Sequence, residues 1–259
     1  MTAKIHPTAI IGERVELGKD VEVGPYCIVE SDVHIGAGSI LQSFVTIGQF
    51  TKIGEGNRFF PHACIGMPPQ DLKFKGEETH TEIGNFNHFR ESTTVHRGTA
   101  HGGGLTKIGD QNLFMVGAHV AHDCFVGNRN VFANSGTLAG HVKVGDCTTV
   151  GAFSAVHQFC RVGDYAFIGG FSVITQDALP YVKSVGNRAK IYGINAIGLQ
   201  RQGFSEEEIN DLRNAYRTLF HKKLRLVEAL DSLRAEYKDK PKVDYLINFI
   251  AESERGIIR

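Results

Sequence analysis

The segment LFMVGAHVAHDCFVGNRNVFANSGTLAGHVKVGDCTTV, residues 113–150, carries an aliphatic or aromatic residue at every sixth position. The same period of six runs unbroken from Ile5 to Ile65, resumes from Ile83 to Val95, and continues from Ile108 to Ile174. Neither the period of about 3.6 residues of a helix nor the period of about 2 of an ordinary strand explains this spacing. A solenoid explains it, because each hexapeptide supplies one short strand and one turn. The sequence therefore predicts a mainly β fold, a parallel β-helix with the periodic side chains inside.

Glycine often follows the periodic residue directly, as at Gly12, Gly18, Gly24 and Gly36. Glycine adopts positive φ at little steric cost, which suits the tight turn that each hexapeptide needs. We therefore interpret these residues as turn glycines selected for their backbone conformation.

Three departures from the period define the domain organisation. Residues 67–82 are polar and contain Pro68 and Pro69. Residues 101–107 interrupt the repeat a second time. Both segments are predicted to be loops that leave the solenoid. Beyond Pro180 the period disappears. We expect a β-helix over residues 1–185, with loop insertions near 67–82 and 101–107, and a C-terminal α-helical domain over residues 186–259.

The C-terminal region carries helical signals. Ser205 and Glu208 have the spacing of a capping box, and apolar residues follow at helical intervals through Phe220. Two further helices are expected over residues 226–236 and 243–254. Together they would cap the open end of the solenoid, as repeat proteins require for solubility.

Composition excludes several classes of protein. Lysine and arginine number 28 and aspartate and glutamate number 28, so no overall basic charge favours nucleic acid. The first ten residues, MTAKIHPTAI, lack a signal-peptide pattern, and no apolar run is long enough to cross a membrane. The five cysteines form no CxxC pair. We expect a cytoplasmic protein with reduced thiols, no metal, no cofactor, no nucleic-acid partner and no stable membrane insertion.

The repeats resemble those of hexapeptide acyltransferases, a resemblance that implies a left-handed coil of three hexapeptides. Residues 18 apart would then stack about 4.8 Å from each other. His122, His141 and His157 would gather near one edge, with the Gly140 N–H one rung above the His122 ring. Acyl transfer to a hydroxyl needs a base and a donor for the oxyanion, and this arrangement supplies both. Asp123 would hold the imidazole in its productive tautomer.

Longer motifs make the resemblance more specific. QDLK at 70–73, HRGT at 96–99, GGGLTKIG at 102–109, AHVAHDCFVGN at 118–128, LAGHV at 138–142 and VHQFC at 156–160 resemble the UDP-N-acetylglucosamine O-acyltransferases, which begin lipid A biosynthesis. The likeness extends to NAYR at 214–217 and to the GIIR ending. It implies a homotrimer that moves an (R)-3-hydroxyacyl group from acyl carrier protein to the 3-position of UDP-N-acetylglucosamine.

The resemblance also implies roles by matching position. His122 would be the general base, Asp123 its partner and Gly140 the oxyanion donor, while Gly170 would measure the acyl chain. Acyl carrier protein would dock on basic residues of the C-terminal region. The residues implied in substrate binding are Gln70, Asp71, Lys73, His96, His119, His141, His157, Gln158, Asn195 and Arg201.

Two positions depart from the family pattern. Ile197 stands where the best-known members carry an acidic residue near the sugar, and Gln202 follows Arg201 where they carry paired arginines. Other readings stay open at this point. They are a metal-dependent hydratase on the same fold, an N-acyltransferase acting later in the same pathway, a coenzyme A-dependent acetyltransferase, and a scaffold without activity.

Overall fold

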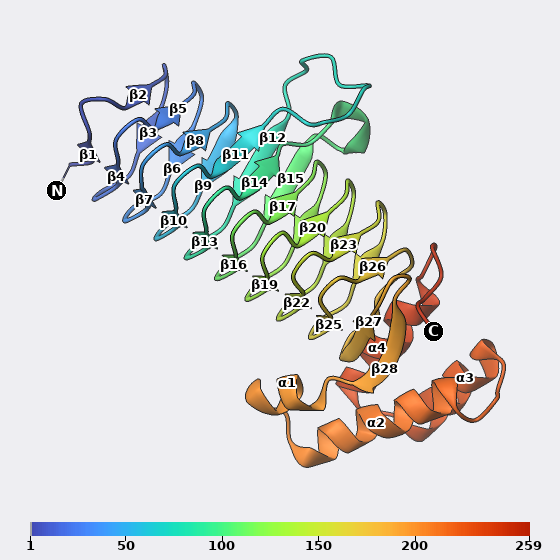
Figure 1. The fold of residues 1–259 in the computed structure, drawn as a ribbon. Coiled ribbons are helices and arrows are strands. Elements are labelled where there is room, and N and C mark those ends of the chain that lie inside the picture. The colour runs from blue at the N-terminus through green and yellow to red at the C-terminus, as the bar shows by residue number, and fades with distance from the viewer. Residues whose placement is uncertain (1) are drawn as a thin grey trace.

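A computed structural model describes residues 2–259 and places them in a three-sided solenoid followed by a helical region (Figure 1). Sheet 1 has 11 strands. They are β1 (Lys4–Ile5), β4 (Glu22–Val23), β7 (Ile40–Leu41), β10 (Arg58–Phe59), β13 (His88–Phe89), β16 (Leu113–Phe114), β19 (Val131–Phe132), β22 (Thr149–Val150), β25 (Phe167–Ile168), β27 (Val182–Val185) and β28 (Lys190–Ile194).

The other two sides are sheets of nine and eight strands. Sheet 2 contains β2 (Ile10–Ile11), β5 (Ile28–Val29), β8 (Thr46–Ile47), β11 (Cys64–Met67), β14 (Thr94–His96), β17 (His119–Val120), β20 (Thr137–Leu138), β23 (Ala155–Val156) and β26 (Val173–Ile174). Sheet 3 contains β3 (Glu16–Leu17), β6 (His34–Ile35), β9 (Thr51–Ile53), β12 (His80–Ile83), β15 (Leu105–Ile108), β18 (Phe125–Val126), β21 (Lys143–Val144) and β24 (Arg161–Val162).

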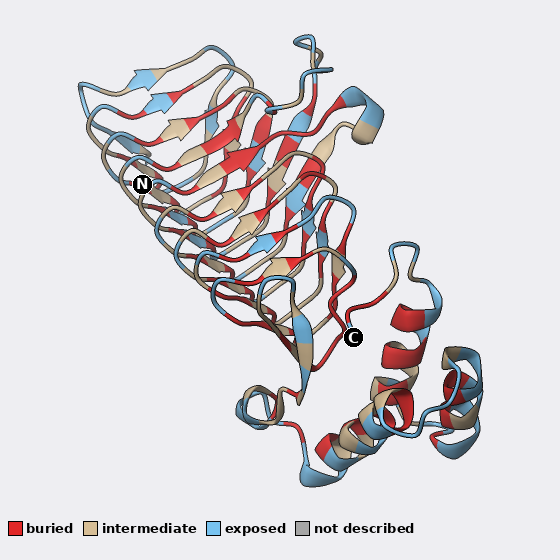
Figure 2. Ribbon diagram, turned by 45° about the vertical axis from the view of Figure 1, so that its right-hand side comes forward, coloured by how far each residue is buried: buried red, intermediate tan, exposed pale blue. Residues whose placement is uncertain are grey.

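The predicted parallel coil and its register are confirmed. Val120 pairs with Leu138, and Leu138 with Val156, each 18 residues further along the chain. The periodic side chains point inward, and four phenylalanines on sheet 1 stack with ring centroids 4.7–5.0 Å apart: Phe59, Phe89, Phe114 and Phe132. From β4 onward most strands contain a buried residue, drawn red in Figure 2, whereas β1, β2 and β3 contain none.

The explanation of the glycines as positive-φ turn residues is wrong. With the buried periodic residue counted as place one, positive φ within the repeats occurs mainly at place four, mostly in other residue types such as Asp123 (φ 59°) and His141 (φ 62°), and Gly66 (φ 77°) is an exception at place two. The place-two glycines are needed because the next coil passes close by. A Cβ on Gly24 would lie 2.5 Å from the Gln42 carbonyl oxygen.

A ladder of buried asparagines runs inside the solenoid. The Asn112 side chain accepts a hydrogen bond from the Asn130 N–H at 2.8 Å and donates to the Gly127 carbonyl at 2.9 Å and to Asn87 at 3.0 Å. Asn87 in turn bonds Asn57 in the same way. Each amide therefore joins three successive coils and satisfies backbone groups that no strand reaches.

Both insertions leave the solenoid at the corner between sheets 2 and 3. The first comprises residues 68–79, between β11 and β12. The second follows β14 and contains the short 3₁₀ helix Ala100–Gly102, whereas residues 105–107, expected in the loop, belong to β15. The two loops therefore stand side by side in front of the next turn of this corner, as Figure 1 shows.

The chain ends in α1 (Ala196–Arg201), α2 (Glu206–Phe220), α3 (Leu226–Glu236) and α4 (Pro241–Ala251). The predicted capping box of Ser205 and Glu208 is confirmed, with bonds of 3.2 and 2.8 Å. Ile257 is buried in the helical core and Ile258 in the solenoid core, so the C-terminus joins the two. None of the helices in residues 2–259 is long and apolar enough to span a membrane.

We predict that Asn112→Ala lowers the free energy of unfolding by about 2 kcal/mol or more, because it leaves the buried Asn130 N–H without an acceptor. Thermal or urea denaturation at fixed protein concentration measures the effect. Asn134→Ala, an exposed asparagine on a neighbouring turn, is the matched control and should change stability little. Equal losses in the two variants would contradict a role for the ladder.

Candidate active site

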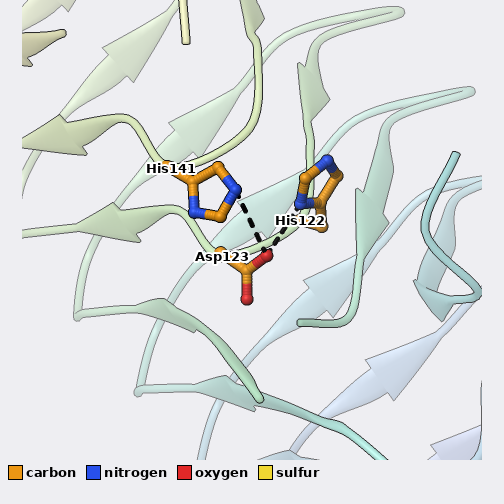
Figure 3. Close-up of side chains that lie close together, drawn as sticks. All are labelled: His122, Asp123 and His141. Carbon is orange, nitrogen blue, oxygen red and sulfur yellow. Dashed lines mark hydrogen bonds and ion pairs between the residues drawn. The ribbon is translucent and has the colours of Figure 1, made fainter. Parts of the chain in front are cut away.

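His122 and Asp123 form a hydrogen-bonded pair at the corner between sheets 2 and 3 (Figure 3). They occupy places three and four after the buried Val120, so β17 fixes both. The turn conformation at Asp123 folds its carboxylate back toward its neighbour, and Oδ2 lies 2.7 Å from His122 Nδ1. An Nδ1–H donated to Asp123 leaves Nε2 with a free lone pair, the state a general base requires.

The Asp123 carboxylate is fully buried, with 0% of the side chain exposed. Thr99 donates to it twice, from its N–H to Oδ1 at 2.9 Å and from its hydroxyl to Oδ2 at 2.6 Å. The Asp123 N–H donates to the Thr106 hydroxyl at 2.8 Å. With His122 as the third donor to the carboxylate, these bonds satisfy an anion that burial would otherwise destabilise.

His141 is the second imidazole of the cluster. Its Nε2 lies 3.8 Å from Asp123 Oδ2, and its ring meets the His122 ring edge-on with centroids 5.1 Å apart (Figure 3). The other face stacks on Phe159 at 4.5 Å. Burial lowers the pKa of His141, with nearby His122 adding to the effect. His141 therefore faces the site as a neutral hydrogen-bonding group.

These three residues also have the spacing of metal ligands. One ligand atom from each of His122, Asp123 and His141 lies within 4.8 Å of the others. However, both Asp123 oxygens already accept hydrogen bonds, and Oδ2 accepts from His122 itself. A cation bound there would have to displace these bonds, so the donor set is better matched to a base than to a metal.

Gly140 lies directly against the His122 ring, as the 18-residue register predicts. A Cβ at this position would be 2.6 Å from His122 Cε1 and 2.8 Å from Nε2. Among residues 2–259 the Gly140 N–H has no hydrogen-bond acceptor. At Gly140 the free donor stands beside the base.

Two further histidines line the outward face of sheet 2. Burial lowers the pKa of His96 to about 4 and also lowers the pKa of His119, and the charge of His122 adds to both shifts. Their rings are 4.9 Å apart, and His119 Nδ1 bonds the Thr94 hydroxyl at 2.7 Å. His96 Nδ1 is buried without a partner in the structure described. Both rings are therefore neutral near pH 7.

The first loop reaches this corner through Asp71, whose Oδ2 lies 3.1 Å from His101 Nε2. A hydrogen bond from the Lys73 N–H lowers the pKa of Asp71, and the charges of His101 and His122 act in the same direction. The Arg97 guanidinium packs over the Phe74 ring at 5.4 Å and so holds the loop down. The side chains of Gln70 and Lys73 are exposed.

Several expected site residues lie away from His122 within one chain. His157 and Gln158 are exposed, and His157 contacts Arg255 at 3.4 Å instead of joining the other histidines. Asn195 bonds the Tyr165 carbonyl at 3.2 Å at the start of α1, and Arg201 is exposed at its end. Asn195 and Arg201 therefore belong to the helical end of the chain, whereas Gln158 lies one coil beyond Gly140 at the same corner, with its side chain exposed.

Sequence reasoning missed Thr99, Thr106, His101 and Phe159. The 18-residue rule finds Phe159, which stacks on His141. The second insertion contains His101 and lies between Thr99 and Asp123, and Thr106 is one residue off the register. Thr99 lies 24 residues before Asp123 and Thr106 lies 17 residues before it. A cavity of about 460 Å³ opens beside this cluster, with Asp123, His141 and Phe159 in its wall.

Comparisons with known proteins match both the solenoid and the helical end of the chain. A family model described as UDP N-acetylglucosamine O-acyltransferase, domain 2, matches residues 177–258, and a bacterial transferase hexapeptide model matches residues 14–49 and 141–176. The chain is 48% identical over 256 residues to the acyl-[acyl-carrier-protein]–UDP-N-acetylglucosamine O-acyltransferase of Thermodesulfovibrio yellowstonii, covering 99% of each.

Solved structures are similar over nearly the whole chain. LpxA from Acinetobacter baumannii is 48% identical with a TM-score of 0.96, and 98% of this chain and 99% of that chain are covered. The UDP-N-acetylglucosamine O-acyltransferase of Moraxella catarrhalis is 46% identical, with the same TM-score and the same coverage.

We predict that Gly140→Ala lowers kcat by about 100-fold, because the added methyl would push the imidazole out of line. Steady-state kinetics of acyl transfer measures this. Gly136→Ala adds a methyl in the same region away from the ring, where its closest contact would be the Ala133 carbonyl at 3.1 Å. The control should lose stability but keep its turnover. Equal kcat in the Gly140 variant and the natural protein would contradict the assignment of this contact.

Proposed function

The chain belongs to the UDP-N-acetylglucosamine O-acyltransferases, and we propose that it moves an (R)-3-hydroxyacyl group from acyl carrier protein to the 3-hydroxyl of UDP-N-acetylglucosamine. It is an acyltransferase of lipid A biosynthesis with a left-handed parallel β-helix and a helical end. The near-complete coverage of O-acyltransferase relatives leaves the hydratase, the coenzyme A enzyme and the inactive scaffold without support.

The observation that carries the mechanism is the His122–Asp123 bond beside the free Gly140 N–H. His122 Nε2 removes the proton of the sugar hydroxyl as its oxygen attacks the thioester carbonyl. The Gly140 N–H stabilises the oxyanion that forms. Collapse of this intermediate breaks the C–S bond, and His122 returns the proton to the departing sulfur. The two substrates and His122 account for every bond and proton in these steps, without a cofactor or a metal.

The neutral imidazoles and the first loop suit the sugar nucleotide. His96, His119 and His141 have lowered pKa values, so near pH 7 they are neutral hydrogen-bonding groups. His119 keeps only Nε2 for a sugar hydroxyl, because its Nδ1 bonds the Thr94 hydroxyl. Asp71 is held at the same corner by His101. Gln70 and Lys73 stand on that loop with exposed side chains, free to contact the diphosphate or the donor.

A homotrimer with sites between neighbouring solenoids would complete this cleft. Asn195 and Arg201 lie at the helical end and do not approach His122 of their own chain, so in this proposal a second copy supplies those that bind substrate. His157 and Gln158 are exposed at the corner of the site, beyond Gly140. A row of exposed aromatic rings along the corner between sheets 1 and 2 supports lateral packing. Phe153 is 58% and Phe171 71% exposed, and they stack at 5.2 Å. Ile197, the departure from the family pattern, is also 67% exposed on α1.

Acyl carrier proteins are acidic, and the C-terminal region offers a basic surface for docking. Arg213, Arg217 and Lys222 line one cavity of about 650 Å³ with His221, and Lys223 and Arg201 lie in the same region of the chain. Rim charges of this kind mainly govern association rate. A cytoplasmic location fits the five free thiols, because oxidising compartments favour disulfides.

We predict that His122→Ala reduces turnover by about 100-fold to 10,000-fold or more while the fold persists, because a positioned base is lost. Mass spectrometry of products from UDP-N-acetylglucosamine and its 3-amino analogue, offered with hydroxyacyl carrier proteins, tests the reaction itself. His6→Ala, an exposed histidine on the first coil, is the control for loss of an imidazole away from the base. Undiminished kcat in His122→Ala would require another base, with His141 the next candidate.

Gly170 is proposed to limit the acyl chain. A Cβ there would meet only the Ala152 backbone, at 3.4 Å, so the residue leaves open space on the outer surface of the solenoid. We predict a long donor, near 3-hydroxymyristoyl, and a shift toward shorter chains in Gly170→Met. Each lost CH₂ contact is worth roughly 0.8 kcal/mol, so kcat/KM ratios across donors should reveal it. An unchanged profile would instead direct attention to Phe171 or Phe153.

A further inference from the structure

We propose that Thr99 is a positioning residue that orients the Asp123 carboxylate and, through it, the base His122. This inference rests on the proposed role of His122. The Thr99 hydroxyl and the His122 Nδ1 both bond the same carboxylate oxygen, Oδ2, at 2.6 and 2.7 Å. The Thr99 N–H holds the other oxygen, Oδ1, at 2.9 Å. Thr99 thus donates a hydrogen bond to each oxygen and fixes the plane of the Asp123 carboxylate.

The hydrogen-bond distances favour one direction for the Thr99 hydroxyl. Its oxygen accepts the Gly102 N–H at 3.1 Å, as the N-cap of the 3₁₀ helix Ala100–Gly102, and the other possible acceptor of its proton, His101 Nε2, is farther away than the carboxylate, at 3.4 Å. A hydroxyl has one proton, which is then directed to the acceptor-only carboxylate at 2.6 Å. With Oδ2 held in this way, His122 must present Nδ1–H to it and keep Nε2 free for the substrate.

The same loop closes over the carboxylate. A Cβ on Gly102 would lie 2.2–2.5 Å from the Asp123 carboxylate atoms, so the glycine backbone covers the anion at close range. Thr99 itself has 0% relative exposure. Water therefore does not compete for the carboxylate, and its hydrogen bonds retain the strength of a site with low dielectric.

Thr106 provides a matched comparison within the same site. It is also a threonine with 0% exposure, and its hydroxyl contacts Asp123 as well. That contact is to the Asp123 N–H, at 2.8 Å, not to the carboxylate. Removal of either hydroxyl disturbs a buried bond to the same residue. Only the loss at Thr99 changes the donors around the group that faces His122.

The test compares Thr99→Val, Thr99→Ser and Thr106→Val by kcat, KM and the pH profile of kcat/KM with the acyl carrier thioester and UDP-N-acetylglucosamine. In Thr99→Val the carboxylate loses a donor and keeps more negative charge toward the imidazole, so His122 holds its proton to higher pH. We expect the acidic limb of the kcat/KM profile to shift to higher pH by about half a unit. We also expect kcat to fall about tenfold or more, with KM nearly unchanged.

The controls separate orientation from stability. Thr99→Ser keeps the hydroxyl and should stay within about threefold of the natural kcat, with an unshifted limb. Thr106→Val should melt at lower temperature but keep the natural pH profile. None of the three variants replaces another titratable group around His122: Asp71, His96, His101, His119 and His141. Thr99→Ser keeps the hydroxyl that lies 3.4 Å from His101 Nε2, so it also controls for the loss of that contact.

Three results would overturn the proposal: a Thr99→Val profile that superimposes on the natural one, the same shift in Thr106→Val, or a displaced limb in Thr99→Ser. If Thr99→Val does not fold, the pH profile of Thr99→Ser still tests the proposal, because a displaced limb there would contradict it. Activity that survives His122→Ala refutes the general-base mechanism itself. Activity lost in His122→Ala but untouched in Thr99→Val refutes only the role of Thr99.

Discussion

Parallel backbone hydrogen bonds join each coil of the solenoid to the next on all three sides, and the 18-residue register that they impose decides which side chains meet. The asparagine ladder reinforces this register from inside, because each amide bonds to the coil before and the coil after its own. A slip of one hexapeptide would move a strand to a different sheet. The His122–Gly140 contact is therefore a consequence of the same bonds that hold the solenoid together.

Features that depend only on this register can be predicted from the sequence, and few others can. Period six yields the coil, and an offset of 18 pairs His122 with Gly140. The rule fails where an insertion changes the count, so Thr99 could not be placed beside Asp123 in advance. It also fails for His157, since a position near the same edge of the solenoid does not specify where the side chain points, and His157 contacts Arg255 instead. The role of the place-two glycines escapes prediction because the approach of the next coil cannot be inferred from one repeat alone.

Electrostatic conditions at the corner follow from burial by the loops. The histidines around His122 have lowered pKa values because they are desolvated and because they repel one another's charge. The buried Asp123 carboxylate is the counter-charge within the cluster, and it bonds directly to His122. A proton taken from substrate is thus best stabilised on His122, while the surrounding rings stay neutral.

The availability of the Gly140 N–H depends on the side chain that stands one coil further on, because at the same corner the Glu13 N–H does bond the Ser31 hydroxyl. At the corner between sheets 3 and 1, the side chain at place three accepts the place-three N–H of the coil before it. The Asp110 N–H bonds Asn128, the Asn128 N–H bonds Asp146, and the Asp146 N–H bonds Asp164. At the corner between sheets 2 and 3 the residue one coil beyond Gly140 is Gln158, whose exposed side chain does not accept this N–H in residues 2–259. The repeat thus leaves one backbone donor open beside the base, where the oxyanion of acyl transfer can use it.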